Sequence, residues 1–270
     1  MTDATGFPAG LVQAALADAL SARTGGAPVV LAVSGLQGSG KSTFAAQIVD
    51  AAGRSGLAAA TLSLDDVYLT RAQRRALAAR VHPLLATRGP PGTHDLALAS
   101  DTLDAVAAGR PLRLPRFDKL ADDRRPRHDW PRVDAPLDLL VMEGWCLGTP
   151  PQPPAALAEP LNELERAEDA AGRWRTHCND ALRDHYPALW RRFDRLWLLQ
   201  APGFEVVARW RWEQEQALQA AAPGRSGMDP AALMRFLQHY ERVSRHALHT
   251  LPTLADRVVA LDEHRRPRVD

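Results

Sequence analysis

Residues 29–44 read VVLAVSGLQGSGKSTF, and this stretch decides the fold. An apolar run at 29–33 leads into GLQGSGKS at 35–42, which matches the pattern G-x-x-x-x-G-K-[ST]. This pattern is typical of a phosphate-binding loop between a buried strand and a helix. The glycines let the backbone fold around a phosphate chain with its N–H groups pointing inward. The stretch therefore predicts nucleoside triphosphate binding, with a helix over about 41–52 after the loop.

The residues of this loop have distinct expected roles. Lys41 is expected to hold the outer phosphates, and the hydroxyl of Ser42 is expected to ligate Mg²⁺. The positive end of the following helix adds its dipole to the phosphate site. The predicted ATP-binding residues are Gly35, Leu36, Gln37, Gly38, Ser39, Gly40, Lys41, Ser42 and Thr43.

Length and composition describe an ordinary globular protein. The chain has 270 residues, of which 46% are hydrophobic and 24% charged, and Lys+Arg 33 nearly balances Asp+Glu 32. This balance gives no electrostatic case for nucleic acid or an anionic membrane as a partner. Two cysteines, Cys146 and Cys178, are too few for a disulfide scaffold or a zinc site. A reducing, cytoplasmic setting fits these cysteines best, and the sequence has no signal-peptide pattern and no long apolar run.

Strand-like and helix-like segments alternate along the rest of the chain, and the loop, its helix and the next apolar run have the spacing of a βαβ unit. Further strands are expected over 58–64, 137–142, 196–200 and 257–261. Helices are expected over 10–22, 71–87, 95–108, 161–193, 204–221 and 229–248, with loops or breaks at 88–95, 116–136, 149–160 and 224–227. The predicted fold is α/β, a doubly wound parallel sheet of the P-loop NTPase type. We expect one domain, 1–270, with an N-terminal helix and a helical insertion at about 150–193.

Acidic residues follow two of these strands. Asp65 and Asp66 end the run at 58–64, and Glu143 ends the run at 137–142. Ligands of open α/β sheets bind outside the carboxyl ends of the strands. Transfer of a γ-phosphoryl group needs Mg²⁺ and a positioned base, so we assign Asp65 as the base and Glu143 to the Mg²⁺ side. The alternative for either acid is to cap the next helix.

Charged loops offer groups that suit an anionic acceptor. An arginine or lysine there can grip a carboxylate, and arginine can do so with two parallel hydrogen bonds. The alternatives are a tight turn at 88–95 whose Asp95 caps the next helix, and a solvated loop at 116–119. The candidate acceptor residues from these loops are Arg88, His94, Asp95, Arg116, Asp118 and Lys119.

Two arginines follow the strand at 196–200 and are candidates for a lid over the triphosphate. Arg209 and Arg211 lie on the helix predicted at 204–221. A lid arginine stabilises charge on the transferring group and excludes water. Positions i and i+2 face different sides of a helix, so we expect one of the two to reach the phosphates. The alternative is a surface ion pair with Glu213 or Glu215.

The chain resembles the bacterial-type D-glycerate 3-kinases, which are related to uridine kinase, phosphoribulokinase and pantothenate kinase. The segments that carry the resemblance are, in order, SGLQGSGKST, LSLDDVYLT, HPLLATRGPPGTHD, PRFDK and VMEGW. It continues through PLNELERAEDAAGRW, LLQAPGFEVVARWRWEQE and FLQHYERVSRHAL, and covers residues 28–268. The resemblance implies a kinase that uses ATP and Mg²⁺ to convert D-glycerate, a small hydroxy acid, to 3-phosphoglycerate.

The same resemblance implies roles by position. Asp65 matches the catalytic acid after the second strand, Tyr68 matches an acceptor-site tyrosine, and Glu143 matches a glutamate on the Mg²⁺ side. One of the two lid candidates matches the lid arginine, and Asp66 joins the expected acceptor site beside Tyr68.

Other readings remain open at the level of sequence. Phe117 stands where such kinases often carry a tyrosine, which removes a hydroxyl near the acceptor. A related kinase could act on a nucleoside, pantothenate or another sugar acid. From a different class, the chain could be a non-catalytic nucleotide-binding module. The sequence says nothing of the oligomeric state.

Overall fold

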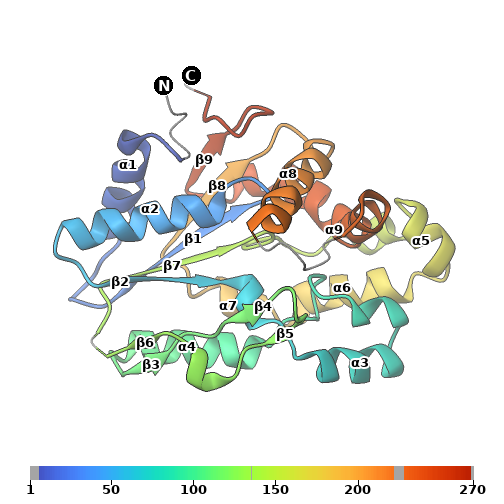
Figure 1. Cartoon of the computed structure of the whole chain (residues 1–270), viewed down its shortest axis with the longest axis horizontal. Helices are drawn as coiled ribbons and strands as arrows, with labels where there is room; N and C mark the ends of the chain where they lie inside the picture. The colour runs from blue at the N-terminus through green and yellow to red at the C-terminus, as the bar shows by residue number, and fades with distance from the viewer. Residues whose placement is uncertain (1–5, 135, 222–227, 269–270) are drawn as a thin grey trace.

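A five-stranded parallel sheet forms the centre of the computed structural model, which describes residues 6–134, 136–221 and 228–268 (Figure 1). Each neighbouring pair of strands in the order β2-β7-β1-β8-β9 is parallel. β1 and β7 are buried at every residue, which explains why their sequences are continuously apolar. The strands are β1 (Val29–Gly35), β2 (Ala59–Ser63), β7 (Leu139–Gly144), β8 (Arg195–Gln200) and β9 (Arg257–Ala260).

Helices cover both faces of this sheet, as the doubly wound fold requires (Figure 1). Leu31 and Val33 of β1 face one core, while Val30 and Ala32 face the other, because side chains alternate along a strand. The first core is closed by α1 (Ala9–Ser21), α2 (Lys41–Arg54) and α8 (Val206–Ala221). The second is closed by α4 (Leu96–Ala107), α6 (Arg173–Asp184), α7 (Pro187–Trp190) and part of α9 (Pro230–Thr250). The predicted fold class is confirmed.

Two predicted helices are shorter than the sequence indicated. The segment 71–87 is divided into α3 (Arg71–Arg80) and the 3₁₀ helix η2 (Pro83–Ala86), because Pro83 has no N–H to continue the helix. The segment 161–193 is divided into α5 (Glu163–Glu168), α6 and α7. Gly172 has a φ of 72°, which a continuous helix does not allow, and Pro187 starts a new helix after α6.

The predicted loop at 116–136 contains short paired strands. β4 (Phe117–Asp118) and β5 (Asp123–Arg124) form an antiparallel hairpin, and β3 (Leu112–Arg113) pairs with β6 (Arg132–Val133). The remaining elements are the 3₁₀ helices η1 (Leu64–Val67), η3 (Arg127–Asp129), η4 (Pro154–Leu157) and η5 (Leu251–Thr253). The break predicted at 224–227 lies outside the described residues. Within the described ranges, no helix is long and apolar enough to cross a membrane.

Candidate active site

The loop between β1 and α2 has the backbone that phosphate binding requires. Gly38 and Gly40 have φ values of 82° and 88°, in the left-handed region that favours glycine. A Cβ on Gly38 would lie 2.5 Å from the Cβ of Trp210, and one on Gly35 would lie 3.0 Å from the carbonyl oxygen of Leu199. No side chain caps the N-terminus of α2, where Gly40 is the N-cap. The first N–H groups of α2 are therefore free of a side-chain cap and suited to an anion.

Ser42 and Glu143 meet beside this loop. The Ser42 hydroxyl donates to Oε1 of Glu143 at 3.1 Å, while Oε2 of Glu143 is buried and has no hydrogen-bond partner. A hydroxyl and an unpaired carboxylate oxygen fit the hard oxygen donors that Mg²⁺ prefers. Burial lowers the pKa of the partly buried Lys41 ammonium, and the nearby Glu143 and Asp65 act in the opposite direction. The nitrogen Nζ of Lys41 lies 3.4 Å from the carbonyl oxygen of Leu36.

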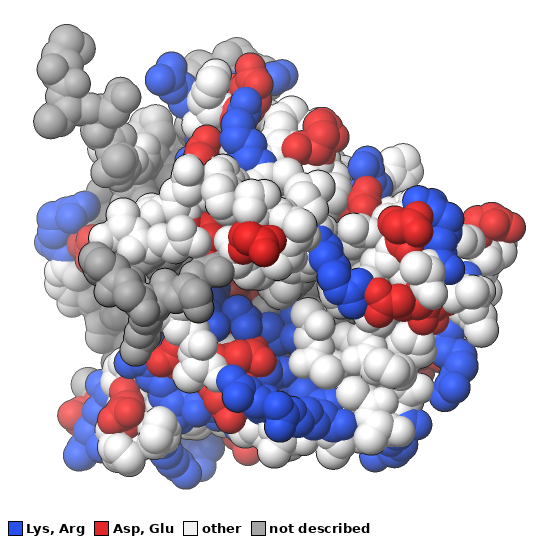
Figure 2. Space-filling model, turned by 45° about the vertical axis from the view of Figure 1, so that its right-hand side comes forward, with Lys and Arg blue, Asp and Glu red and all other residues white. Residues whose placement is uncertain are grey.

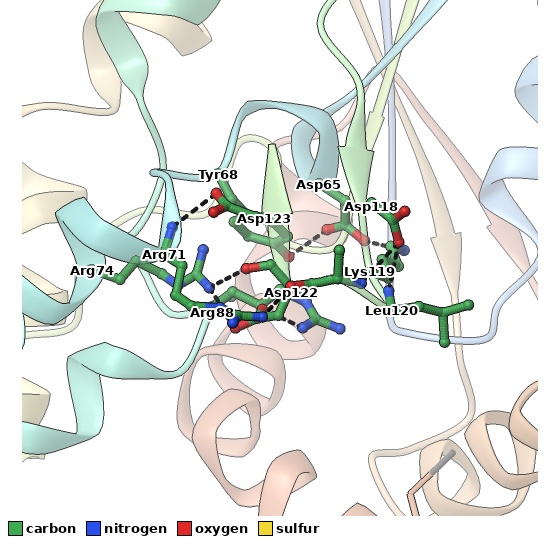
Figure 3. A network of polar contacts seen from close by, with 12 residues as sticks. Asp65, Tyr68, Arg71, Arg74, Arg88, Asp118, Lys119, Leu120, Asp122 and Asp123 are labelled. Atoms are coloured by element: carbon green, nitrogen blue, oxygen red, sulfur yellow. Dashed lines mark hydrogen bonds and ion pairs between the residues drawn. The ribbon is translucent and has the colours of Figure 1, made fainter. Parts of the chain in front are cut away.

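Asp65 follows β2, in η1, and both of its carboxylate oxygens are engaged. The Tyr68 hydroxyl donates to Oδ1 at 2.6 Å, and Nζ of Lys119 donates to Oδ2 at 2.6 Å (Figure 3). Burial by itself would raise the pKa of Asp65, but the Lys119 and Lys41 cations and the two hydrogen bonds hold it well below its usual range. The side chain of Ser63, and not that of Asp65, caps η1. The capping alternative therefore does not account for Asp65.

A cavity of about 160 Å³ joins these groups. The predicted site residues that line it include Lys41, Ser42, Asp65, Tyr68, Arg88, Lys119, Glu143 and Arg211. Lysine and arginine side chains gather around the hollow in the face shown in Figure 2. The lining therefore combines the phosphate loop, two acids and several cations in one space.

Arg88 is held rigidly at the edge of this cavity. Its Nη1 atom lies 2.5 Å from Oδ1 of Asp122, and its guanidinium carbon lies 5.7 Å from the ring centroid of Phe117 and 5.8 Å from that of Phe236. The Tyr240 hydroxyl donates to the Arg88 carbonyl at 2.9 Å, so α9 is fastened to this loop. Arg88 can present its remaining N–H groups to a carboxylate without much loss of side-chain entropy.

His94 and Asp95 support the site from behind and do not line the cavity. His94 is buried, its ring stacks on Tyr68 with centroids 4.8 Å apart, and its Nδ1 atom lies 2.6 Å from the Tyr186 hydroxyl. Asp95 accepts from the Leu98 N–H at 3.0 Å as the N-cap of α4. Asp95 therefore caps a helix, which was the alternative predicted for it.

Asp66, Arg116 and Asp118 fix the β4–β5 hairpin. Oδ1 of Asp66 accepts from the Phe117 N–H at 3.1 Å, and its Oδ2 lies 3.3 Å from Nη1 of Arg116. Oδ1 of Asp118 accepts from two backbone N–H groups at the hairpin tip. Asp118 borders the open groove beside the cavity, whereas Asp66 and Arg116 do not line the cavity. The contacts that the structure gives Asp66 and Arg116 hold the hairpin, and their expected place in the acceptor site stays a prediction.

The two lid candidates separate as the helical geometry requires. Arg211 lines the cavity, where its Nη1 atom donates to Gln214 at 2.6 Å and its Nη2 atom lies 3.7 Å from Glu215. Arg209 is turned to the surface and pairs with Glu263 at 3.3 Å. A catalytic role for Arg209 does not fit this placement, because residues i and i+2 of a helix face different sides.

Comparisons with known proteins agree with this geometry. No family model matches the chain. An uncharacterized kinase of Schizosaccharomyces pombe, mug58, is 32% identical over 268 residues, which cover 90% of this chain and 91% of the relative. The chloroplastic D-glycerate 3-kinase of Arabidopsis thaliana is 32% identical over 262 residues, which cover 89% of this chain and 54% of the relative. The chain belongs to the same family of kinases as mug58, and its phosphate loop makes it a P-loop kinase.

Solved structures of kinases have the same fold. A D-glycerate 3-kinase from Cryptococcus neoformans superposes on this P-loop kinase with a TM-score of 0.75 and 26% identity, covering 96% of each chain. A possible uridine kinase from Bacillus stearothermophilus, 18% identical with a TM-score of 0.51, shares the fold. The predicted class of enzyme, a phosphotransferase with an alcohol group as acceptor, is confirmed.

Several residues of this kinase site were missed by sequence reasoning. They are Asp122 on the hairpin and the cavity-lining residues Trp145, Gln214, Phe236 and Tyr240. Phe236 and Tyr240 are four positions apart on α9, and an aromatic pair at that spacing is typical of a helix face in the core. The segment FLQHYERVSRHAL contributed to the resemblance, but nothing in its pattern distinguishes a cavity wall from a core.

Proposed function

We propose that the chain is a D-glycerate 3-kinase, which transfers the γ-phosphoryl group of ATP to a hydroxyl of D-glycerate and gives 3-phosphoglycerate. The observation that carries this proposal is the lining of one cavity by Lys41 of the phosphate loop, the acid Asp65, and the cations Arg88 and Lys119. The loop suits a triphosphate, the acid suits an alcohol, and the cations suit a carboxylate. The relatives named D-glycerate 3-kinase support this acceptor.

The residues of the phosphate loop would hold ATP, and Ser42 and Glu143 would hold Mg²⁺. Glycines 35, 38 and 40 turn backbone N–H groups toward the phosphates, and Lys41 supplies a positive charge that the described part of the site does not pair with a carboxylate. Mg²⁺, when bound, neutralises charge on the phosphates and leaves fewer charges for the protein to stabilise. The unpaired Oε2 atom of Glu143 is the donor that this role needs.

In the proposed reaction Asp65 binds the acceptor hydroxyl and takes its proton as the new oxygen–phosphorus bond forms. The bond between the γ-phosphorus and its bridging oxygen breaks at the same time, and ADP leaves with that oxygen. Tyr68 orients the Asp65 carboxylate through its 2.6 Å hydrogen bond. Arg211 faces the same cavity and stabilises the charge on the group in transfer.

The test is ATP consumption with a panel of D-glycerate, L-glycerate, nucleosides, pantothenate and other sugar acids. We expect turnover with D-glycerate, and we expect Asp65→Asn to lower kcat by about a hundredfold or more. Asp129→Asn, at an exposed position outside the cavity, is the matched control and should leave kcat unchanged. Turnover of another panel member in place of D-glycerate would overturn the acceptor. Full activity of Asp65→Asn would overturn the base.

We also infer that residues 1–270 form a single domain. We infer that the partner is a small hydroxy acid and neither nucleic acid nor membrane. We further infer that the protein works in the cytoplasm. Two cores packed on opposite faces of one sheet support the single domain. Cys146 and Cys178 are both free and buried, which suits a reducing compartment.

A further inference from the structure

The chain uses lysine at very few positions. Lysine and arginine together number 33, and two of them are lysines, Lys41 and Lys119, so 31 are arginines. Both lysines line the same cavity. A lysine carries a compact charge on a flexible stem, whereas an arginine carries a rigid planar fork. In a chain this rich in arginine, an ammonium group at position 119 points to a task that a guanidinium would perform less well.

This task concerns Asp65, because Lys119 forms an ion pair with its carboxylate. Nζ of Lys119 is 2.6 Å from Oδ2 of Asp65, and the Tyr68 hydroxyl occupies Oδ1 (Figure 3). A base whose oxygens both accept strong hydrogen bonds is a weak base. The Lys119 side chain is nevertheless 55% exposed, so its ammonium group has room to move away from Asp65. Lys119 can therefore move from Asp65 to the carboxylate of an acceptor that binds beside it.

Two of the other cations in the cavity are fixed in place. Arg88 is held by Asp122 and by two aromatic rings, and Arg211 contacts Gln214 and Glu215. The backbone at Lys119 is also anchored, because Asp118 accepts two N–H groups at the hairpin tip and Asp122 is tied to two arginines. What can move is the Lys119 side chain, on its four-carbon stem.

A short hydroxy acid fits the gap that this movement opens. Its hydroxyl and its carboxylate are a few bonds apart, so an acceptor whose hydroxyl meets Asp65 places its carboxylate within reach of the Lys119 ammonium. Arg88 borders the same cavity and can bind the second carboxylate oxygen. An alcohol without a carboxylate, or a water molecule, offers Lys119 no replacement for Asp65.

We propose that Lys119 is an exchangeable counter-ion of Asp65, which moves to the carboxylate of an incoming hydroxy acid and so frees Asp65 to accept the proton of the acceptor hydroxyl. The proposal rests on the proposed function, since it needs Asp65 as the base. It makes the acceptor carboxylate a requirement for turnover as well as for binding. It also protects ATP from hydrolysis while no acceptor is bound, because Asp65 then stays paired and cannot activate water.

The first test is ATP hydrolysis without any acceptor. We expect Lys119→Met to raise the hydrolysis rate by about tenfold, since it exposes Asp65 to water. Arg125→Met removes an exposed positive charge just after the hairpin and should leave the rate unchanged. An unchanged or lower rate of hydrolysis in Lys119→Met would overturn the proposal. It would mean that Lys119 binds the phosphates of ATP, or that its ion pair with Asp65 does not restrain hydrolysis. A wild type that fails to phosphorylate D-glycerate would overturn the proposed function, and this hydrolysis test would still decide the role of Lys119.

The second test compares D-glycerate with glycerol, which lacks the carboxylate. We expect Lys119→Met to lower the kcat ratio of D-glycerate to glycerol by about tenfold, whereas a residue that only binds the carboxylate would change KM alone. A ratio of kcat values equal to that of the wild type would contradict the exchange.

The third test observes Lys119 directly. Protein labelled with ¹³C at the ε-carbon of lysine should give two signals, and Lys119→Met assigns them. With a non-hydrolysable ATP analogue and Mg²⁺ bound, D-glycerate should shift the Lys119 signal and glycerol should not. A Lys119 signal that is the same with and without D-glycerate would overturn the proposal.

Discussion

Lys41 lies in the phosphate loop with no carboxylate of the described residues at ion-pair distance. Burial lowers the pKa of its ammonium, which shows that the surroundings disfavour the charge. Such a group contributes little to the fold and becomes favourable only when phosphate oxygens arrive. Lys41 therefore serves ligand binding at some cost to the stability of the protein without ligand, as is common at functional sites.

Lys41→Ala should abolish transfer and leave the fold intact. We expect kcat to fall by about a hundredfold or more, because a cation aimed at the transferring charge is lost. The thermal midpoint should stay the same or rise, since a partly buried ammonium without a carboxylate partner is removed. Circular dichroism and thermal unfolding of both proteins check this. A protein that melts at a clearly lower temperature would mean that Lys41 is mainly structural.

Two buried histidines make stability depend on pH. Burial lowers the pKa of His94 and of His239 from 6.5 to about 4. The unfolded chain therefore takes up protons as the pH falls through 6.5, while the folded chain does not until about pH 4. The stability that the two neutral histidines contribute is fully present above pH 6.5 and is lost as the pH falls from 6.5 to about 4. Each histidine should lower the free energy of unfolding by about 2 kcal/mol between pH 7 and pH 5.

Urea unfolding at pH 7 and pH 5 measures this loss. Replacing both residues, in His94→Gln/His239→Gln, should remove the loss that they cause. Burial raises the pKa of Asp66 to about 6, so Asp66 acts in the opposite direction over the same pH range and remains in the variant. The exposed His128 is the control, and His128→Gln should leave the difference unchanged. A double variant that loses as much stability as the wild type would show that other groups cause the pH dependence.

At the scale of elements, the β4–β5 hairpin is organised by Asp122. This residue has a φ of 52°, an uncommon value outside glycine, and its carboxylate lies 2.6 Å from Nη2 of Arg74 and 2.5 Å from Nη1 of Arg88. The Arg74 side chain is fully buried. One exposed turn therefore neutralises a buried cation and positions an active-site cation.

Asp122→Asn tests this role, because asparagine tolerates the same backbone and lacks the charge. We expect the free energy of unfolding to fall by about 2 kcal/mol, since Arg74 loses its counter-ion. The KM for the acceptor should rise, since Arg88 loses its anchor. Denaturant unfolding and steady-state kinetics measure both, with Asp129→Asn as the control at an exposed position. Unchanged stability would mean that the arginines find other partners.

The elements that the sequence predicted well are those with a local signal. β1, α2 and β2 follow from a buried run, a glycine-rich loop and a second buried run, and Asp65 and Glu143 follow from the rule that ligands bind at strand ends. The hairpin has strands of two residues, too short for any periodicity. The segment 161–193 was predicted as one long helix because the positive φ of its glycine, Gly172, has no signal in the sequence.

At the scale of the whole molecule, the site is assembled from parts distant in sequence. Lys41 lies on α2, Asp65 follows β2, Lys119 is on the hairpin, and Arg211 and Tyr240 come from α8 and α9. The sequence predicted a helix that carries Arg209 and Arg211 over the triphosphate, but it could not tell which of the two faces the cavity. The orientation of α8 depends on contacts across the first core, in which Val207 and Trp210 are fully buried. Such contacts have no local signal.

Because one cavity joins these parts, ATP with Mg²⁺ should stabilise the whole molecule. Ligand at about 100 times its Kd adds about 2.7 kcal/mol, and the thermal midpoint of a chain of this size should then rise by about 5–10 °C. Ser42 and Glu143 supply one hydroxyl and one carboxylate, so Mg²⁺ must take its other ligands from phosphates and water. Mg²⁺ without nucleotide should therefore give almost no shift.

Glu143→Gln separates the metal from the nucleotide. ATP with EDTA should shift the midpoint of the variant as much as that of the wild type, because the loop and Lys41 are intact. The additional shift on adding Mg²⁺ should be much smaller in the variant, because an amide oxygen is a weaker ligand than a carboxylate for this hard cation. Thr149→Ala, which changes a buried side chain outside the cavity, controls for general loss of stability. An equal Mg²⁺-dependent shift in Glu143→Gln and the wild type would place the metal elsewhere and leave the unpaired oxygen of Glu143 without this explanation.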